Sequence, residues 1–232
     1  MRLRAKVLLG LFPFLLTLGA APKPRIGLVR VQGKIAKPAV KAIHLDKEAC
    51  GKAHSDESLL VGPKGALANA VVTWGVQETT TQRKGDAGTQ RIGTPQSAVT
   101  LIQRGCAYEP HIVVVRPGQP LVIVNSDPIL HTTGFTAKRN RAKTAAQPKG
   151  AEPMTVTFVR PEAVRLYCDV HAWMDGWVYI TEAENFRVTG LDGKFSLAGI
   201  PRGTKISVWH EKLGVREGEV GEGAVEVLFA LP

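Results

Sequence analysis

The sequence predicts an all-β protein, and two features of the chain support this fold class. Short runs rich in Val, Ile, Thr and aromatic residues recur along the chain, separated by Gly, Pro, Asn or Asp. No long apolar pattern with the 3.6-residue period of a helix follows the first 21 residues. Regularly spaced short strands of this kind are typical of a β-sandwich or barrel. We expect strands at residues 26–31, 70–74, 111–115, 121–125, 154–159, 164–168, 177–181, 195–198, 205–209 and 225–229.

The first 21 residues have the pattern of a secretory signal peptide. Arg2, Arg4 and Lys6 precede an apolar stretch, residues 7–18, and the small residues 19–21 follow it. The apolar stretch is too short to span a bilayer, and no later segment approaches the roughly 20 apolar residues that a spanning helix needs. We therefore expect a secreted or periplasmic protein without a membrane span.

About 210 residues remain after the signal, enough for one large all-β domain or two small ones. Without the three basic signal residues, 27 Lys and Arg face 20 Asp and Glu, a net charge of +7. Such a surface favours acidic partners, whereas an exported protein rarely meets nucleic acid, so we expect none. The basic residues concentrate at 138–149, which we interpret as an exposed loop, either simply solvated or a docking patch.

The three cysteines cannot all pair, so one must have another role in an oxidising compartment. Cys50 and Cys106 lie in polar, turn-like settings, whereas Cys168 lies in YCDVHAWM beside a histidine and a methionine. A disulfide between Cys50 and Cys106 is the economical pairing. It would stabilise the fold by roughly 4 kcal/mol on the chain-entropy model, and Cys168 would remain unpaired and could itself serve as a ligand.

Between the third and fourth predicted strands, Pro117 and Gly118 in RPGQP favour a hairpin turn. The residue types then divide the mature chain into three parts. We expect an N-terminal β segment at 22–96, a middle block with the metal-type residues at 97–182, and a C-terminal β segment at 183–232.

The C-terminal segment contains a turn at residues 191–193, then Phe195, then a Pro201-Arg202-Gly203 turn before a strand. This pattern, over about 45 residues, resembles the carboxypeptidase regulatory-like (transthyretin-like) sandwich repeat. VRVQGKIAKPAV and GALANAVVTW in the N-terminal segment resemble the early strands of the same module. The resemblance implies an additional small β-sandwich formed by the two flanks, packed together around the middle block.

The strongest chemical signal is Cys168-Asp-Val-His171-Ala-Trp-Met174 at the end of a predicted strand. Thiolate, imidazole and thioether follow one another at intervals of three residues, so a short loop can turn all three onto one ion. His131, in NSDPILHTTG, would add a second imidazole. Two histidines and one cysteine with a weak axial methionine are diagnostic of a type 1 copper site. Magnesium or calcium would prefer oxygen ligands, and zinc gains little from a thioether.

Together these motifs resemble the cupredoxins, the blue copper proteins of the plastocyanin and amicyanin kind. The resemblance covers roughly the middle 85 residues and implies a Greek-key cupredoxin sandwich or barrel holding one type 1 copper ion. By the match, His131, Cys168, His171 and Met174 are the copper ligands. Asn125 and Asp127 match the polar turn that leads to the first histidine and would lie in the second coordination shell.

The sequence departs from the cupredoxin pattern beside its histidines. Family members often have a proline before the first histidine and an asparagine after it, where this chain has Leu130 and Thr132. Many have a proline after the loop histidine, where this chain has Ala172. These changes bear on hydrogen bonding around the ligands, and hence on the reduction potential, more than on metal binding.

Simpler interpretations of single residues remain. Cys168 could be a core residue and Met174 a core filler, and Trp173 and Trp177 ordinary packing around the loop. Cys168 with His171 could form a thiol nucleophile and its base, but the sequence shows no evident orienting group or oxyanion donor for them. We interpret His44, His54, His111 and His210 as structural or surface residues.

The resemblance implies single-electron transfer between protein redox partners, without enzymatic activity, with His171 nearest the surface as the exit for electrons. A dehydrogenase, cytochrome or oxidase with an acidic docking face would be such a partner. A copper-binding carrier or stress protein without electron-transfer turnover is the alternative. The flanks alone would suggest a structural or carbohydrate-interacting module.

Overall fold

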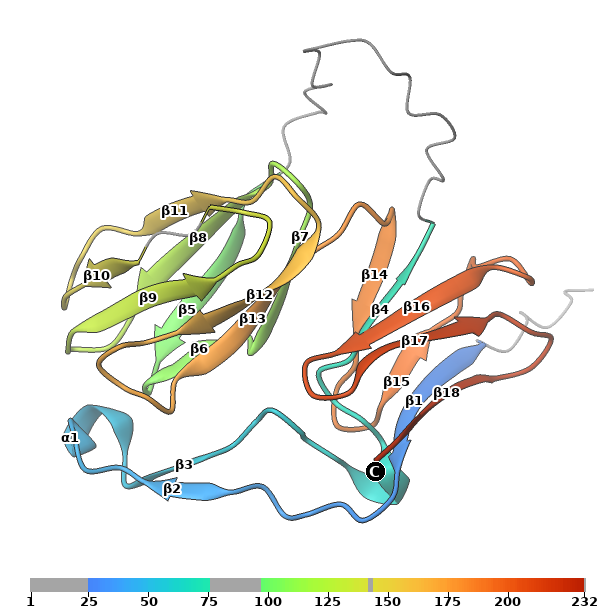
Figure 1. Ribbon diagram of the computed structural model, residues 1–232, viewed down its shortest axis with the longest axis horizontal. Helices are drawn as coiled ribbons and strands as arrows, with labels where there is room; N and C mark the ends of the chain where they lie inside the picture. Colours follow the sequence, from blue (N-terminus) through green and yellow to red (C-terminus); the bar gives the residue numbers. More distant parts are fainter. Residues whose placement is uncertain (1–24, 76–96, 142–143, 232) are drawn as a thin grey trace, which may run out of the picture.

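The computed structural model describes residues 25–75, 97–141 and 144–231. The predicted signal peptide, residues 1–21, lies outside the described residues. Within them, the all-β prediction is confirmed: strands predominate, and the helices are one α-helical turn and one 3-10 turn. Each of the ten predicted strands is present, with bounds that differ by a few residues at most. Figure 1 shows two sandwiches side by side, with a long arm running beneath them.

The middle sandwich consists of two sheets from the central part of the chain. One sheet has the strand order β10 (Ala145–Gln147), β9 (His131–Thr136), β12 (Glu162–Tyr167), β13 (Asp175–Ile180) and β7 (Ile112–Val115). The other has the order β11 (Met154–Thr157), β8 (Pro120–Asn125), β5 (Val99–Arg104) and β6 (Ala107–Glu109). Buried and partly exposed residues alternate along β8 and β13, as expected for strands with one face on a core. Leu121 and Ile123 of β8 thus share one apolar core with Val164 and Leu166 of β12.

Two local predictions in this sandwich are wrong. The turn at Pro117 and Gly118 does not form a hairpin, because β7 pairs with β13 in one sheet and β8 pairs with β5 and β11 in the other. The turn itself is present, with Gly118 in the left-handed region at a φ of 82°, but it leads the chain from one sheet to the next. The basic stretch 138–149 is not a loop throughout, since residues 145–147 form β10, which pairs with β9.

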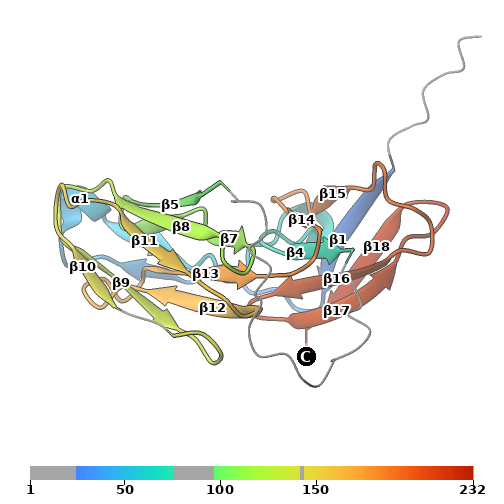
Figure 2. The ribbon, with the colours of Figure 1, turned by 90° about the horizontal axis from the view of Figure 1, so that it is seen from above.

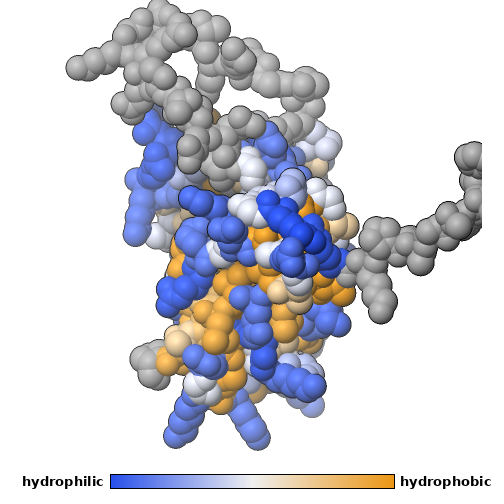
Figure 3. All heavy atoms as spheres, turned by 90° about the vertical axis from the view of Figure 1, so that its right-hand side faces the viewer, coloured by the Kyte–Doolittle hydropathy of each residue, from blue (hydrophilic) through white to orange (hydrophobic). Residues whose placement is uncertain are grey.

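The flank sandwich is formed by both ends of the chain together, as predicted. One sheet has the order β15 (Lys194–Ser196), β1 (Ile26–Gln32) and β18 (Val225–Ala230). The other has the order β14 (Asn185–Val188), β4 (Val71–Trp74), β16 (Lys205–His210) and β17 (Gly214–Glu219). Leu197, Ile206 and Phe229 are fully buried in its core. Figure 3 views this end of the molecule, where hydrophobic residues show between hydrophilic ones.

The flank sandwich lies beside the middle sandwich rather than around it (Figure 2). Val71 and Trp209 of the flank sandwich pack against Ile112 and Val114 of β7 in a third buried cluster. Strands β4 and β7 are therefore buried at every position, which explains why β7 is apolar throughout and β4 is apolar except for Thr73. The resemblance of the flanks to the carboxypeptidase regulatory-like repeat stays a prediction.

The arm, residues 33–70, leaves β1 and returns to β4. It contains the paired strands β2 (Val40–Ala42) and β3 (Ala53–Ser55), the helix α1 (Lys47–Cys50) and the 3-10 helix η1 (Pro63–Gly65). Although it belongs to the N-terminal flank, its tip at α1 lies against the middle sandwich (Figure 1). There Cys50 forms a disulfide with Cys106, the pairing that the cysteine count predicts, and leaves Cys168 as a free, buried thiol.

Candidate metal centre

The middle sandwich brings the two predicted ligand segments together at one end. His131 is the first residue of β9, and Cys168 directly follows β12. These strands are antiparallel neighbours in which Tyr167 lies opposite Gly134, so the end of β12 lies next to the start of β9. Met174 directly precedes β13, which pairs with β12, and the backbone N–H of Cys168 donates to the carbonyl of Met174 at 3.3 Å. Residues 168–174 therefore form a closed loop facing His131.

Three buried ligand atoms from these segments face one another. The Nδ1 atoms of His131 and His171 are 3.0 Å apart, and the Sγ of Cys168 lies 3.8 Å from Nδ1 of His171. All three atoms lie within 4.8 Å of one another. A soft metal bound at ~2.0 Å to nitrogen and ~2.3 Å to sulfur in tetrahedral geometry places such atoms about 3–4 Å apart. The spacing therefore fits a single ion.

Each histidine turns its other nitrogen to a carboxylate. Nε2 of His131 lies 2.8 Å from Oδ2 of Asp127, and Nε2 of His171 lies 3.0 Å from Oδ2 of Asp46. A neutral imidazole carries one N–H, so donation from Nε2 leaves Nδ1 as a bare lone pair. Two lone pairs and a thiol sulfur thus converge in a space where both histidines are fully buried. A metal ion or a shared proton can satisfy such an arrangement, and histidines bound to metals in proteins show this carboxylate partner.

Asp127 and Asn125 hold the first histidine in place. The Asp127 carboxylate also accepts the backbone N–H groups of Gly105 and Cys106, at 2.8 and 2.9 Å. Asn125 accepts the N–H of Asp127 and donates to the carbonyls of Ile129 and Gln147, each at 2.8 Å. The polar turn before His131 is therefore a connected network that fixes the ring.

Thr132 supports the sulfur of Cys168. Its backbone N–H points to Sγ at 3.4 Å, and its hydroxyl lies 3.7 Å from Sγ and accepts the N–H of Asp169 at 2.7 Å. Burial raises the pKa of the Cys168 thiol, but hydrogen bonds from His131 and Thr132 outweigh this effect and lower the pKa to about 6. Burial lowers the pKa of His131, but hydrogen bonds and charge interactions with Cys168 and Asp127 outweigh the effect of burial, so the pKa of His131 is raised.

Met174 and Trp173 complete the surroundings of the loop. Met174 is buried in the same core cluster as Cys168, and its N–H donates to the carbonyl of His171 at 2.9 Å. The rings of His171 and Trp173 are 5.1 Å apart between centroids. His171 itself has no exposed surface. The expectation that an edge of His171 reaches the surface is therefore wrong, because the arm covers it.

The other histidines lie away from the centre. His111 is buried at the contact between the sandwiches, where its ring faces Glu211 and Glu57. Burial lowers the pKa of His111, but Glu211 and then Glu57 outweigh it and raise that pKa. His210 is buried in β16, where burial lowers its pKa to about 4. His44 and His54 belong to the arm.

Sequence reasoning missed Asp46. It lies 85 positions before His131 and 125 before His171, in an arm without a local metal-binding pattern. The signal that could have found it is the cysteine pairing. Cys50 and Cys106 are linked, and Cys106 donates to Asp127 beside His131, so the residues just before Cys50 had to lie close to the centre.

Comparison with known proteins gives fold-level neighbours only. No family model matches the chain, and no curated protein matches it. A copper-containing nitrite reductase from Thermus scotoductus aligns at 20% identity over 43% of this chain, with a TM-score of 0.33. Amicyanin from Paracoccus versutus aligns at 22% identity over 38% of this chain and 86% of its own, with a TM-score of 0.33. A purple cupredoxin from Nitrosopumilus maritimus aligns at 16% identity over 35% of this chain and 98% of its own, with a TM-score of 0.31.

The chain spans a quarter of the length of the nitrite reductase. These neighbours are cupredoxins and a copper enzyme, but similarity at such TM-scores carries no functional argument. The argument for a function rests instead on the geometry of the centre. Separately, neither helix in the described ranges has the length and apolar character needed to cross a bilayer.

Proposed function

We propose that this chain is an exported copper protein that transfers single electrons through a type 1 site. The observation that supports it is the meeting of three buried ligand atoms, Nδ1 of His131, Nδ1 of His171 and Sγ of Cys168. This donor set is the trigonal histidine and cysteine array of blue copper sites. Met174, in the same loop and buried in the same core cluster as Cys168, would supply the weak axial ligand.

A copper ion held there would supply one-electron chemistry by alternating between two oxidation states. The chain's part is to keep the ligands in place through both states. Cys168 is available as a thiolate near neutral pH because its pKa is lowered to about 6. Asp127 fixes the ring of His131, and the 168–174 loop is closed by backbone hydrogen bonds. Rigid ligands that need little rearrangement favour electron transfer over catalysis, so we propose an electron-transfer protein rather than an enzyme.

The partner would be a protein in the secreted or periplasmic compartment, such as a dehydrogenase, cytochrome or oxidase. The net charge of the chain is +10, or +7 without the predicted signal, which would favour an acidic docking face. We propose no nucleic-acid partner.

One observation favours a second function, a copper-binding carrier or stress protein without turnover. His171 is fully buried beneath the arm, so no ligand edge is open to a redox partner. The two functions differ in whether bound copper exchanges electrons reversibly.

A copper titration tests both. Wild-type protein should take up one Cu(II) and develop a strong thiolate-to-copper absorption that a reductant bleaches and an oxidant restores. Cys168→Ser should lose this band. His44→Ala, which removes an exposed imidazole of the arm, should keep it. Uptake of Cu(I) without a reversible redox couple would support the copper-binding carrier or stress protein. The absence of copper uptake by the wild type would refute both proposed functions.

A further inference from the structure

The tip of the arm forms a cap on the middle sandwich. We define the cap as residues 43–51, which contain α1. Ile43 is buried in the core cluster of the middle sandwich together with Cys50 and Cys106. The disulfide joins the cap covalently to Cys106, the residue before β6, and the backbone N–H of Ile43 donates to the carbonyl of Lys52 at 2.9 Å. The cap is therefore anchored to the domain that holds the copper ligands, although the chain reaches it from the flank sandwich.

Asp46 has an unusual backbone and an unusual partner. It precedes α1 at the N-cap position in the left-handed region, at φ 51° and ψ 38°. An N-cap aspartate ordinarily accepts a backbone N–H of the following helix through its side chain. Here no such bond forms, and the carboxylate instead receives Nε2 of His171 at 3.0 Å. A non-glycine residue stays in this region when its surroundings hold it there, and here the disulfide and the contact with His171 do so.

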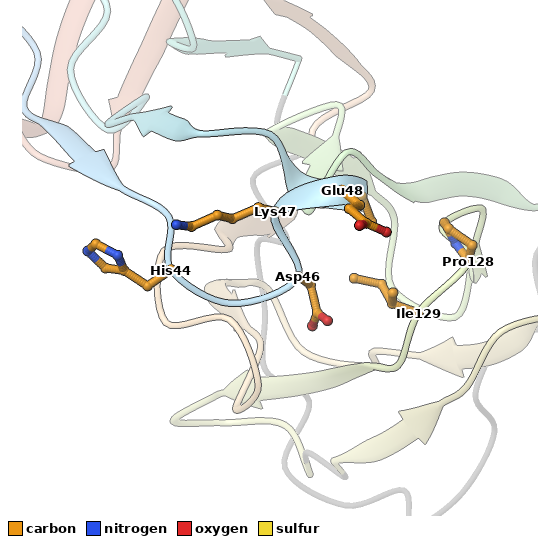
Figure 4. A pocket seen from close by; sticks show the side chains of 7 residues that line it. His44, Asp46, Lys47, Glu48, Pro128 and Ile129 are labelled. Atoms are coloured by element: carbon orange, nitrogen blue, oxygen red, sulfur yellow. The ribbon is translucent and has the colours of Figure 1, made fainter.

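Asp46 lies between the buried ring and solvent. His171 has no exposed surface, whereas the Asp46 side chain is 34% exposed. On its outer side, Asp46 lines a hollow of about 560 Å³ together with His44, Lys47, Glu48, Pro128 and Ile129. Figure 4 shows the Asp46 carboxylate next to Ile129, with His44 pointing away from it. The Asp46 carboxylate thus contacts Nε2 of His171 on one side and is partly exposed to solvent on the other.

We propose that Asp46 is the positioning residue of His171: the disulfide-anchored cap supplies a carboxylate that fixes the ring with Nδ1 toward the copper and closes the site to water. This inference rests on the proposed copper function and deepens it. Asp46 does for His171, from a distant part of the chain, what Asp127 does locally for His131. The two ligands are thereby held by one carboxylate each, and the second is present only while the cap is seated.

Two effects follow from this role. Loss of the acceptor frees the ring to rotate, and removal of such an outer-shell partner typically weakens metal binding by about 10–100-fold. Loss of the negative charge destabilises Cu(II) more than Cu(I), so the reduction potential rises. Asp46→Asn retains an acceptor oxygen but not the charge, and Asp46→Ala removes both. The two substitutions therefore separate positioning from charge.

The experiment compares these variants with Glu48→Gln, which removes an exposed carboxylate from the same cap. We expect Asp46→Ala to bind Cu(II) about 10–100-fold more weakly than wild type in competition with a chelator, Asp46→Asn to recover most of that affinity, and both to show a raised potential. Glu48→Gln should match wild type in affinity and shift the potential far less. Equal affinity and potential in wild type and Asp46→Ala would overturn the inference.

A copper-free measurement separates this inference from the proposed function. Long-range ¹H–¹⁵N NMR on metal-free protein at fixed pH reports which ring nitrogen of His171 carries the proton. Wild type and Asp46→Asn should hold the proton on Nε2, and Asp46→Ala should show a mixture of tautomers. A mixture already present in folded wild type would overturn the role of Asp46 even if copper binds. Failure of wild type to bind copper, with the proton fixed on Nε2, would instead refute the copper function.

Discussion

Replacing both disulfide cysteines, Cys50→Ser/Cys106→Ser, should destabilise the metal-free protein by about 4 kcal/mol. The bond joins residues separated by 56 positions, and the chain-entropy model assigns about 4 kcal/mol to a loop of that length. Both cysteines are buried, with Cys50 8% and Cys106 0% exposed, so burial of the two serine hydroxyls adds to the loss. For a chain of this size each kcal/mol lowers the melting temperature by about 2–4 °C, so the midpoint should fall by about 8–16 °C.

Thermal and urea unfolding of the metal-free protein, followed by circular dichroism and tryptophan fluorescence, measure this loss without a contribution from bound copper. Cys168→Ser is the matched control, because it replaces a buried sulfur without opening a loop. A loss no larger than that of the control would refute the argument that the cross-link restrains the arm. The same double variant should release copper to a chelator faster than wild type, because the cap over His171 is no longer tethered.

Three further predictions concern other parts of the molecule. The thiolate absorbance of metal-free protein should appear with a midpoint near pH 6 and vanish in Cys168→Ser. Since folding lowers this pKa from 9.0 to about 6, the resulting stability is fully present above pH 9 and is lost as the pH falls through 6, and a midpoint near 9 would contradict the contacts described. Gly62→Ala should destabilise the flank sandwich by about 1–3 kcal/mol, since the new methyl group would overlap the backbone carbonyl of Leu191. Gly221→Ala, with open space around it, is the control in the same urea titration. Glu211 raises the pKa of His111 above its usual 6.5, so stability from this pair is present below pH 6.5 and is lost as the pH rises through the raised pKa. Unfolding free energies at pH 5 and pH 8 should therefore differ less in Glu211→Gln than in wild type, and an equal difference would exclude the pair as its source.

Most strands that the sequence predicts have an apolar face on a core, although β5, which buries Leu101 in the same way, was missed. β8 and β18 alternate between buried and outward positions, and β7 is apolar throughout because both its faces are covered. β9, in contrast, reads HTTGFT and was not predicted as a strand. Its glycine, Gly134, lies under the ring of Tyr167, which occupies the space that a side chain would take. The apolar cover of this strand thus comes from a neighbour and leaves no pattern in its own residues.

The candidate ligands were predictable because their chemistry is local. Cys168, His171 and Met174 are close in sequence, and His131 follows a polar turn, so spacing alone suggests one ion. Asp46 was not predictable in the same way. Its partner lies 125 positions away, and its contact depends on where the arm is pinned. The burial of His171 follows from the same long-range contact, which is why the sequence suggested an exposed edge.

The parallel pairing of β1 with β18 sets an order of assembly. Gly27 lies opposite Val225, so β1 has no partner on that side until residues 225–230 have been synthesised. The middle sandwich takes its strands from one continuous stretch and can fold before β1 has paired with β18. A chain truncated before β18 should therefore keep its central domain and expose the edge of β1, the kind of unpaired strand that promotes aggregation.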